Sequence, residues 1–272
     1  MELTFENCFG DKRLQKRAIL MTKDLFFKTV HSIRQISGDY ASQRGWYRFL
    51  RNEKTTEQSI IQEITQQCSS SVKDKIVLSI QDTTEINLFR HRNRIQMDGS
   101  VGSITSSEYG LGFFIHPSFV IDAQCGFPIG FSDIKLWNRS TEKATKYDRK
   151  YKKLPIQEKE SYKWIDSSLK SKEILSQATT AIIVQDREGD IYEQFALVPD
   201  EKTQLLIRSK ADRVLADGIK LFAKLSNCEA SGTFSLDIPG DKRKKQTKRT
   251  AVLEVRFCPV QLKRPDSASK SI

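Results

Sequence analysis

The stretch LSIQDTTE, residues 78 to 85, ends an apolar run at an ionisable residue, Asp82. The same pattern returns in AIIVQDREGD, residues 181 to 190, where the apolar run ends at Asp186. Each run is short and rich in β-branched residues, which predicts a buried strand and not a helix. Two predicted strands that both end in Gln-Asp are the basis for predicting the fold.

Segments around these two strands predict an α/β domain. GLGFFIHPSFVIDA and FPIGFSDIKLW are strand-like, and Pro117 indicates a bulge or an edge position in the first of them. A helix, the second buried strand, a short helix and another strand are then expected over residues 158–175, 181–185, 191–198 and 203–210. Three strands followed by alternating helix and strand is the order of an RNase H-like domain. In that order the first and fourth strands lie side by side.

The segments on either side of this core differ from it in pattern. Residues 11 to about 70 show helical spacing, with Ile60, Ile61, Ile64 and Cys68 on one stripe and a capping box expected at Thr55 and Gln58. In ASQRGWYRFLRN, Trp46, Phe49 and Leu50 form an apolar side. After about residue 215, GTFSLDIPG and RTAVLEVRF predict strands that flank a basic run, DKRKKQTKR. That run is either an exposed hairpin loop or a phosphate-binding segment.

These patterns predict four regions. They are a helical domain over residues 1–72, an incomplete RNase H-like α/β core over 73–215, the start of a β-rich insertion over 216–262, and a disordered tail over 263–272.

Charge and cysteine content limit the class of protein. The 272 residues include 45 Lys and Arg against 34 Asp and Glu, a net charge of +11. A basic surface favours polyanions such as nucleic acid, although a merely soluble basic protein has the same balance. The five cysteines show no CxxC pair, which argues for free thiols in a reducing compartment. With no membrane span or signal peptide in the sequence, a cytoplasmic, nucleoid-associated protein is expected.

The two strand-end aspartates suggest metal chemistry. If their strands are parallel neighbours, Asp82 and Asp186 lie at the same end of the sheet, where open α/β sheets place their sites. Two unpaired carboxylates there repel each other, and a divalent cation removes that cost. Mg²⁺ takes one or two protein carboxylates together with water and phosphate oxygens. The alternative is that each aspartate is a turn or cap residue.

The residues resemble a known family over nearly the whole chain. IQDTTEINL, QDREGDIYE and IRSK, together with GDKRLQKR, ASQRGWYRFLRN and EKESYKW, are similar to motifs of bacterial DDE transposases. The resemblance is to the insertion-sequence-four and transposon-five group. It implies a cut-and-paste transposase that nicks double-stranded DNA at transposon ends with Mg²⁺, or with Mn²⁺ in its place.

The resemblance also implies roles for individual residues. Asp82 and Asp186 fall on the first two catalytic, metal-binding carboxylates. The row Arg44, Arg48 and Arg51, at i, i+4 and i+7, falls in the region that binds the transposon end, where the alternative is a solvated helix face. Arg208 and Lys210 fall on basic positions near the scissile DNA.

One departure from the family concerns the third carboxylate. The Tyr-x2-Arg-x3-Glu-x6-Lys pattern that carries it is not found in this chain, and Glu85 and Glu188 are weak substitutes. A truncated transposase with little or no activity by itself is therefore the expectation, with full-length transposase as a possible partner. The alternatives are a non-catalytic fragment that occupies transposon ends and a decayed remnant.

Overall fold

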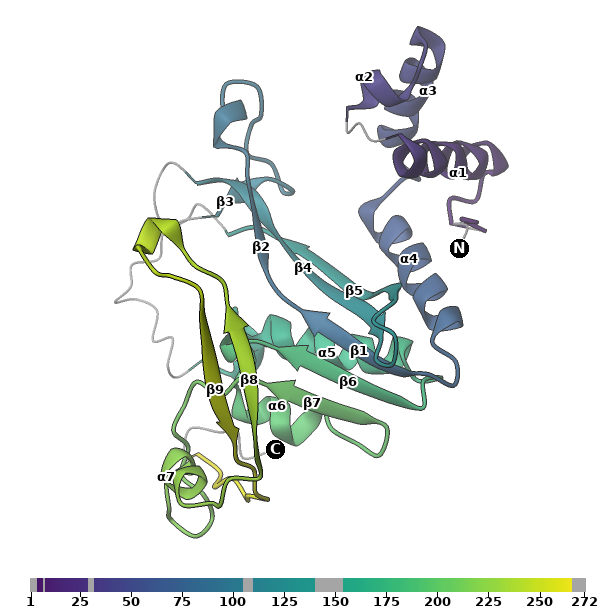
Figure 1. Cartoon of the computed structure of the whole chain (residues 1–272). Helices are drawn as coiled ribbons and strands as arrows, with labels where there is room; N and C mark the ends of the chain where they lie inside the picture. The colour runs from purple at the N-terminus through teal and green to yellow at the C-terminus, as the bar shows by residue number, and fades with distance from the viewer. Residues whose placement is uncertain (1–3, 7, 29–31, 105–109, 140–153, 266–272) are drawn as a thin grey trace. The chain divides into compact units, whose positions relative to one another are not determined.

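A computed structural model describes residues 4–6, 8–28, 32–104, 110–139 and 154–265, and most of the tail expected over 263–272 lies outside these ranges. The chain divides into two compact units, Met1–Arg208 and Ser209–Ile272. Figure 1 shows the elements of both. The predicted helical domain and residues 73–208 of the predicted core fall together in the first unit, while residues 209–215 fall in the second. The boundaries at residues 72 and 215 stay predictions.

The first unit begins with helices, as the sequence predicts. They are α1 (Lys12–Phe27), α2 (Ile33–Ile36), α3 (Tyr40–Leu50) and α4 (Glu57–Ser71). The predicted capping box is wrong by one residue, because the Thr56 side chain caps α4 by accepting from the Ser59 N–H at 3.1 Å. Thr55 belongs to the preceding turn, where its N–H donates to Asn52 O at 2.8 Å. None of the helices in the described ranges is long and apolar enough to cross a membrane.

Helix α4 joins the helical segment to the sheet. Near its start, Ile60 packs against a core cluster of Phe5, Phe9, Ala18 and Phe49. Further along, Cys68 lies in a second core cluster with residues of the sheet. The expected apolar stripe is therefore only partly correct, since the fully buried positions of α4 are Glu63, Thr65 and Cys68, while the three isoleucines are half-buried. The cost of burying the Glu63 carboxylate is offset by a hydrogen bond that it accepts from the Phe5 N–H at 2.8 Å.

The sheet of the first unit mixes parallel and antiparallel strands. Its strands are β1 (Ile76–Gln81), β2 (Thr84–Asn87), β3 (Gly102–Ser103), β4 (Leu111–Asp122), β5 (Pro128–Trp137), β6 (Thr180–Gln185) and β7 (Thr203–Ile207). The order is β2-β4-β1-β6-β7, with β3 and β5 also paired to β4. β1 and β6 are parallel neighbours, which confirms that the two strands lie side by side, and β6 and β7 are also parallel. The fold is thus a mixed α/β fold.

The two Gln-Asp strands each bury one face. Val77, Ser79 and Gln81 are buried in β1, and the side chains between them are half-buried or exposed, with Ile80 at 36% exposed. β6 alternates in the same way. The prediction of buried strands therefore holds for one face of each. The buried face contacts α4, α5 (Tyr162–Ile174) and α6 (Tyr192–Leu197), of which α5 lies along the sheet in Figure 1.

A proline on β4 accounts for the end of β1. The pairing of β1 with β4 stops at Gln81 and Ser118, and that of β2 with β4 starts at Thr84 and Ile115. Pro117 lies opposite this gap and has no N–H to donate to a ladder. The prediction of a bulge or an edge position is met by a register irregularity at Ser118 and Phe119, and among the described strands Pro117 itself pairs only with Ile134 of β5.

The second unit contains α7 (Leu221–Ser226) and an antiparallel hairpin of β8 (Gly232–Ile238) and β9 (Arg249–Val255). Both strands were predicted, and α7 was not. The basic run DKRKKQTKR forms the connection between the strands, with a short 3-10 helix at Lys242–Lys244, and its Lys and Arg residues are exposed. The hairpin-loop interpretation is therefore confirmed, and phosphate binding stays a prediction.

A buried histidine lies beside the gap between β1 and β2. His116 is 0% exposed, and its Nδ1 lies 2.9 Å from Thr83 Oγ1. Burial, together with the positive charges of Lys163 and Lys135, lowers the pKa of His116 to about 4. The folded protein therefore holds this imidazole neutral at pH values where the unfolded chain protonates it.

Stability should fall on acidification because of His116. Its folded pKa lies below the unfolded value of about 6.5, so stability is fully present above that value and is lost as the pH falls towards the folded pKa. Between about pH 7 and about pH 5 the loss should be about 2 kcal/mol, measured by urea unfolding. His116→Gln should lose most of this pH dependence, whatever its stability at neutral pH. His91→Gln, at an exposed histidine, should keep it. An equal pH dependence in all three proteins would contradict the assignment.

Candidate metal site and nucleic-acid interface

Asp82 and Asp186 follow the carboxyl ends of neighbouring strands. Ile80 pairs with Val184 in the parallel ladder of β1 and β6, so two residues further on Asp82 lies opposite Asp186 in register. Both aspartates are exposed. The structure therefore places these two predicted site residues at adjacent strand ends, and their catalytic role stays a prediction.

Each aspartate accepts a backbone N–H with one of its carboxylate oxygens. Oδ1 of Asp82 accepts the Thr83 N–H at 2.7 Å, and Oδ1 of Asp186 accepts the Glu188 N–H at 2.7 Å. Asp186 is thereby the N-cap of a 3-10 helix, Arg187–Gly189. Within the described ranges, the hydrogen bonds of both side chains use Oδ1 and not Oδ2. A capping role and a ligand role are therefore compatible, because they use different oxygens.

The two glutamates near the aspartates in sequence lie on different elements. Glu85 is in β2, where it pairs with Phe114, and Glu188 is in the 3-10 helix that Asp186 caps. Over the part of the chain that the structure describes, no three His, Cys, Asp or Glu side chains are grouped so that they could hold a metal ion. In the described residues, neither Glu85 nor Glu188 therefore completes a three-carboxylate metal site with Asp82 and Asp186.

A buried amide network lies directly behind the aspartates, and sequence reasoning missed it. Gln81 and Gln185, which precede Asp82 and Asp186, are 2% and 4% exposed. The Gln185 amide donates to Gln81 Oε1 at 2.6 Å and to Ser168 Oγ at 3.0 Å. Gln194 of α6 donates to Gln185 Oε1 at 2.6 Å. The signal in the sequence was the repeated glutamine before each aspartate.

Of the two basic residues after β7, one lies beside the strand ends. The backbone N–H of Arg208 donates to Gln185 O at 3.2 Å, which places Arg208 next to the residue that precedes Asp186. Its side chain is exposed. Lys210 is also exposed and belongs to the second unit, so its predicted role near the scissile DNA stays a prediction.

The predicted arginine row lies on α3 and at its C-cap. Arg44, Arg48 and Arg51 are all exposed, and the Arg44 guanidinium lies over the Tyr40 ring at 5.8 Å. The apolar side opposite them is only partly as predicted, because Trp46 and Phe49 are buried but Leu50 is 43% exposed. Arg17 of α1 reaches α3 at Gly45, where an added Cβ would lie 2.9 Å from its guanidinium carbon.

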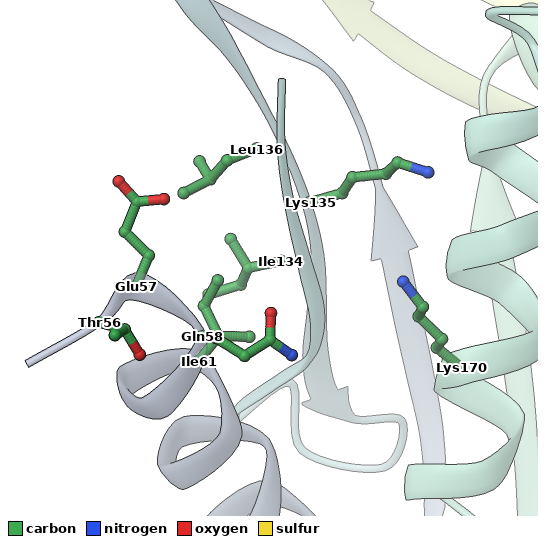
Figure 2. Close-up of a pocket in the computed structure, with 8 residues that line it drawn as sticks. All are labelled: Thr56, Glu57, Gln58, Ile61, Ile134, Lys135, Leu136 and Lys170. Carbon is green, nitrogen blue, oxygen red and sulfur yellow. The ribbon is translucent and has the colours of Figure 1, made fainter. Parts of the chain in front are cut away.

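A pocket of about 390 Å³ lies where α4, β5 and α5 meet. Figure 2 shows it lined by residues of all three elements, with the amines of Lys135 and Lys170 pointing towards each other. Both amines are ion-paired to the same carboxylate, Asp166, at 2.7 and 3.2 Å. Their charge is largely compensated, and Glu57 adds an acid to the lining, so the pocket does not favour an anionic ligand.

Comparison with known proteins supports a role on DNA. Residues 2–55 match a family model described as "Transposase DNA-binding". The match covers α1, α2 and α3 and includes the whole arginine row. It supports a transposase or DNA-binding role, and DNA as the partner.

A solved structure, a piggyBac transposase synaptic complex with hairpin DNA, is similar at 12% sequence identity with a TM-score of 0.35. The similarity covers 92% of this chain and 50% of that one, so the chain spans about half the length of the structure it matches. A likeness of this extent carries no conclusion about function.

Proposed function

We propose that this chain is a transposase polypeptide that binds DNA through its amino-terminal helices and binds a divalent cation at Asp82 and Asp186. The observation that carries the proposal is the match of residues 2–55 to the transposase DNA-binding model, in a chain with two aspartates at adjacent parallel strand ends. In finer terms, the proposal is an RNase H-like DDE transposase of the insertion-sequence-four group, acting on double-stranded transposon ends.

The DNA-binding part of the proposal is supported by charge and exposure. The chain has a net charge of +11, and the three arginines of the row project from one helix and its C-cap into solvent. Guanidinium groups bind phosphate oxygens bidentately, and each phosphate contact releases counterions from DNA. Arg17, held against Gly45, adds a cation from a second helix to this surface.

The donors at the strand ends fit a magnesium ion. Asp82 and Asp186 are exposed, and their carboxylates are hard oxygen ligands. In each, one carboxylate oxygen accepts a backbone N–H. Mg²⁺ is commonly held by one or two carboxylates, with water and substrate phosphate completing its shell. Divalent ions held there would supply activation of the attacking oxygen and stabilisation of the leaving oxygen in phosphoryl transfer. Arg208, one strand away, has a charge suited to a DNA phosphate near this site.

A second candidate function is binding to transposon ends without cutting them, by itself or in competition with a full-length transposase. It is favoured by the small number of acids at the site, since the described ranges bring together no three-ligand group there. Nicking of linear DNA with Mg²⁺ or Mn²⁺ that disappears in Asp82→Asn and in Asp186→Asn would favour cutting. Binding without nicking would favour the second candidate.

Arg48→Ala should weaken binding to linear double-stranded DNA about tenfold, because it removes a charge-assisted hydrogen bond. The slope of log K against log salt should also become smaller by about 1. Fluorescence anisotropy over a series of salt concentrations measures both quantities. Since the Arg48 side chain is exposed, the thermal stability should not change.

Lys73→Ala is the matched control, because it removes one exposed positive charge from the loop after α4. It should leave the affinity within about twofold, as expected for a charge that contacts no phosphate. If the two variants weaken binding equally, the effect is one of net charge, and α3 is not the DNA-binding element.

Wild-type protein should bind Mn²⁺. The double variant that carries both Asp82→Asn and Asp186→Asn should bind it at least about tenfold more weakly, because both changes remove anionic ligands. Electron paramagnetic resonance of free Mn²⁺ measures the affinity without requiring DNA cleavage. Glu193→Gln, at an acidic residue on α6 outside the strand ends, should bind as wild type does. Equal affinity in the aspartate variant and the wild type would remove the metal site from the proposal.

A further inference from the structure

The amide of Gln185 is the centre of a buried hydrogen-bond network that joins four elements. Its nitrogen donates to Gln81 Oε1 of β1 and to Ser168 Oγ of α5, and its oxygen accepts from Gln194 of α6. Both amide protons and the amide oxygen of Gln185 are thus engaged. Within the described residues, Gln81 Nε2 and Gln194 Oε1 have no partner, so Gln185 is the member whose amide the network satisfies in full.

Gly189 is required by the same network. It is buried in the turn after Asp186, and a Cβ at this position would overlap the amide oxygen of Gln185. The turn is closed by a hydrogen bond from Gly189 N–H to Asp186 O at 3.1 Å. Gln194 follows in the next helix, where its N–H donates to Ile191 O at 3.2 Å. The glycine of QDREGD therefore gives the Gln185 amide room to lie where it does.

The network lies at the ends of the two strands. The β1–β6 ladder pairs residues up to Ile80 and Val184, and the two aspartates follow two residues further on. The hydrogen bond from Gln185 Nε2 to Gln81 Oε1 joins the strand ends one residue before each aspartate.

We propose that Gln185, held between Gln81 and Gln194, is a positioning residue that fixes Asp82 and Asp186 beside each other for a shared divalent cation. Its effect on the metal rests on the proposed function. Its effect on the strand ends does not, because the hydrogen bonds involve only residues of the chain itself. Gln185 acts through the two aspartates and contacts no ligand itself.

The test compares Gln185→Leu with Gly189→Ala, which keeps Gln185 but displaces its amide, and with Ser171→Ala as the control. Ser171 is equally buried on α5 and is hydrogen-bonded to Ser132 at 2.9 Å, so its loss removes a polar contact outside the network. Hydrogen–deuterium exchange of metal-free protein at residues 80–84 and 184–190 is the first measurement. Mn²⁺ affinity by electron paramagnetic resonance is the second.

Gln185→Leu and Gly189→Ala should each increase exchange in both segments together and weaken Mn²⁺ binding about 10- to 100-fold, as loss of support for metal ligands does. Ser171→Ala should do neither. If Gln185→Leu does not fold, Gly189→Ala decides alone. Unchanged exchange in both segments, or equal changes in Ser171→Ala, would overturn the positioning role. Mn²⁺ binding that survives the two aspartate substitutions would instead overturn the metal site, while the exchange data still decide the role of Gln185.

Discussion

The in-register parallel pairing of β1 with β6 is the constraint on which the candidate site depends. Ile76 to Ile80 pair with Thr180 to Val184, so the two Gln-Asp pairs leave the sheet side by side. A slip of one residue would turn each side chain to the other face of the sheet. Gln81 would then leave the buried layer and lose its bond to Gln185. The alternating buried side chains and the glutamine pair therefore specify the same register.

A second constraint comes from the neighbouring strand. β4 supports β1 up to Gln81, but Pro117 then offers no donor, and the chain leaves the ladder at Asp82 before pairing resumes at Thr84. The buried His116 lies next to this gap, with its Nδ1 near Thr83 Oγ1. Asp82 is thus exposed at a strand end because of a residue on β4, whereas Asp186 is exposed because β6 itself ends in a turn.

The sequence predicted the elements that local pattern controls. The helices before residue 72, the two Gln-Asp strands and the side-by-side placement of those strands are all confirmed. It did not predict the cap at Thr56, the buried Glu63 or the amide network, because each depends on a partner that periodicity does not identify. Gln81 and Gln185 are 104 residues apart, and only the assembled sheet brings their amides together. Likewise, the half-exposed second face of β1 depends on what packs against the sheet, which an apolar run does not reveal.

The chemical nature of the network suits a site that holds a cation. A lysine or arginine behind the strand ends would also have held two carboxylates close together, but its charge would have compensated theirs and weakened their attraction for a metal. Apolar side chains would have left the charge intact without a directional bond between the strands. Neutral amides supply the directional bond and leave both carboxylates negative. The use of Gln81, Gln185 and Gln194 here is therefore compatible with the proposed cation site, because it joins the ends of β1 and β6 without neutralising Asp82 or Asp186.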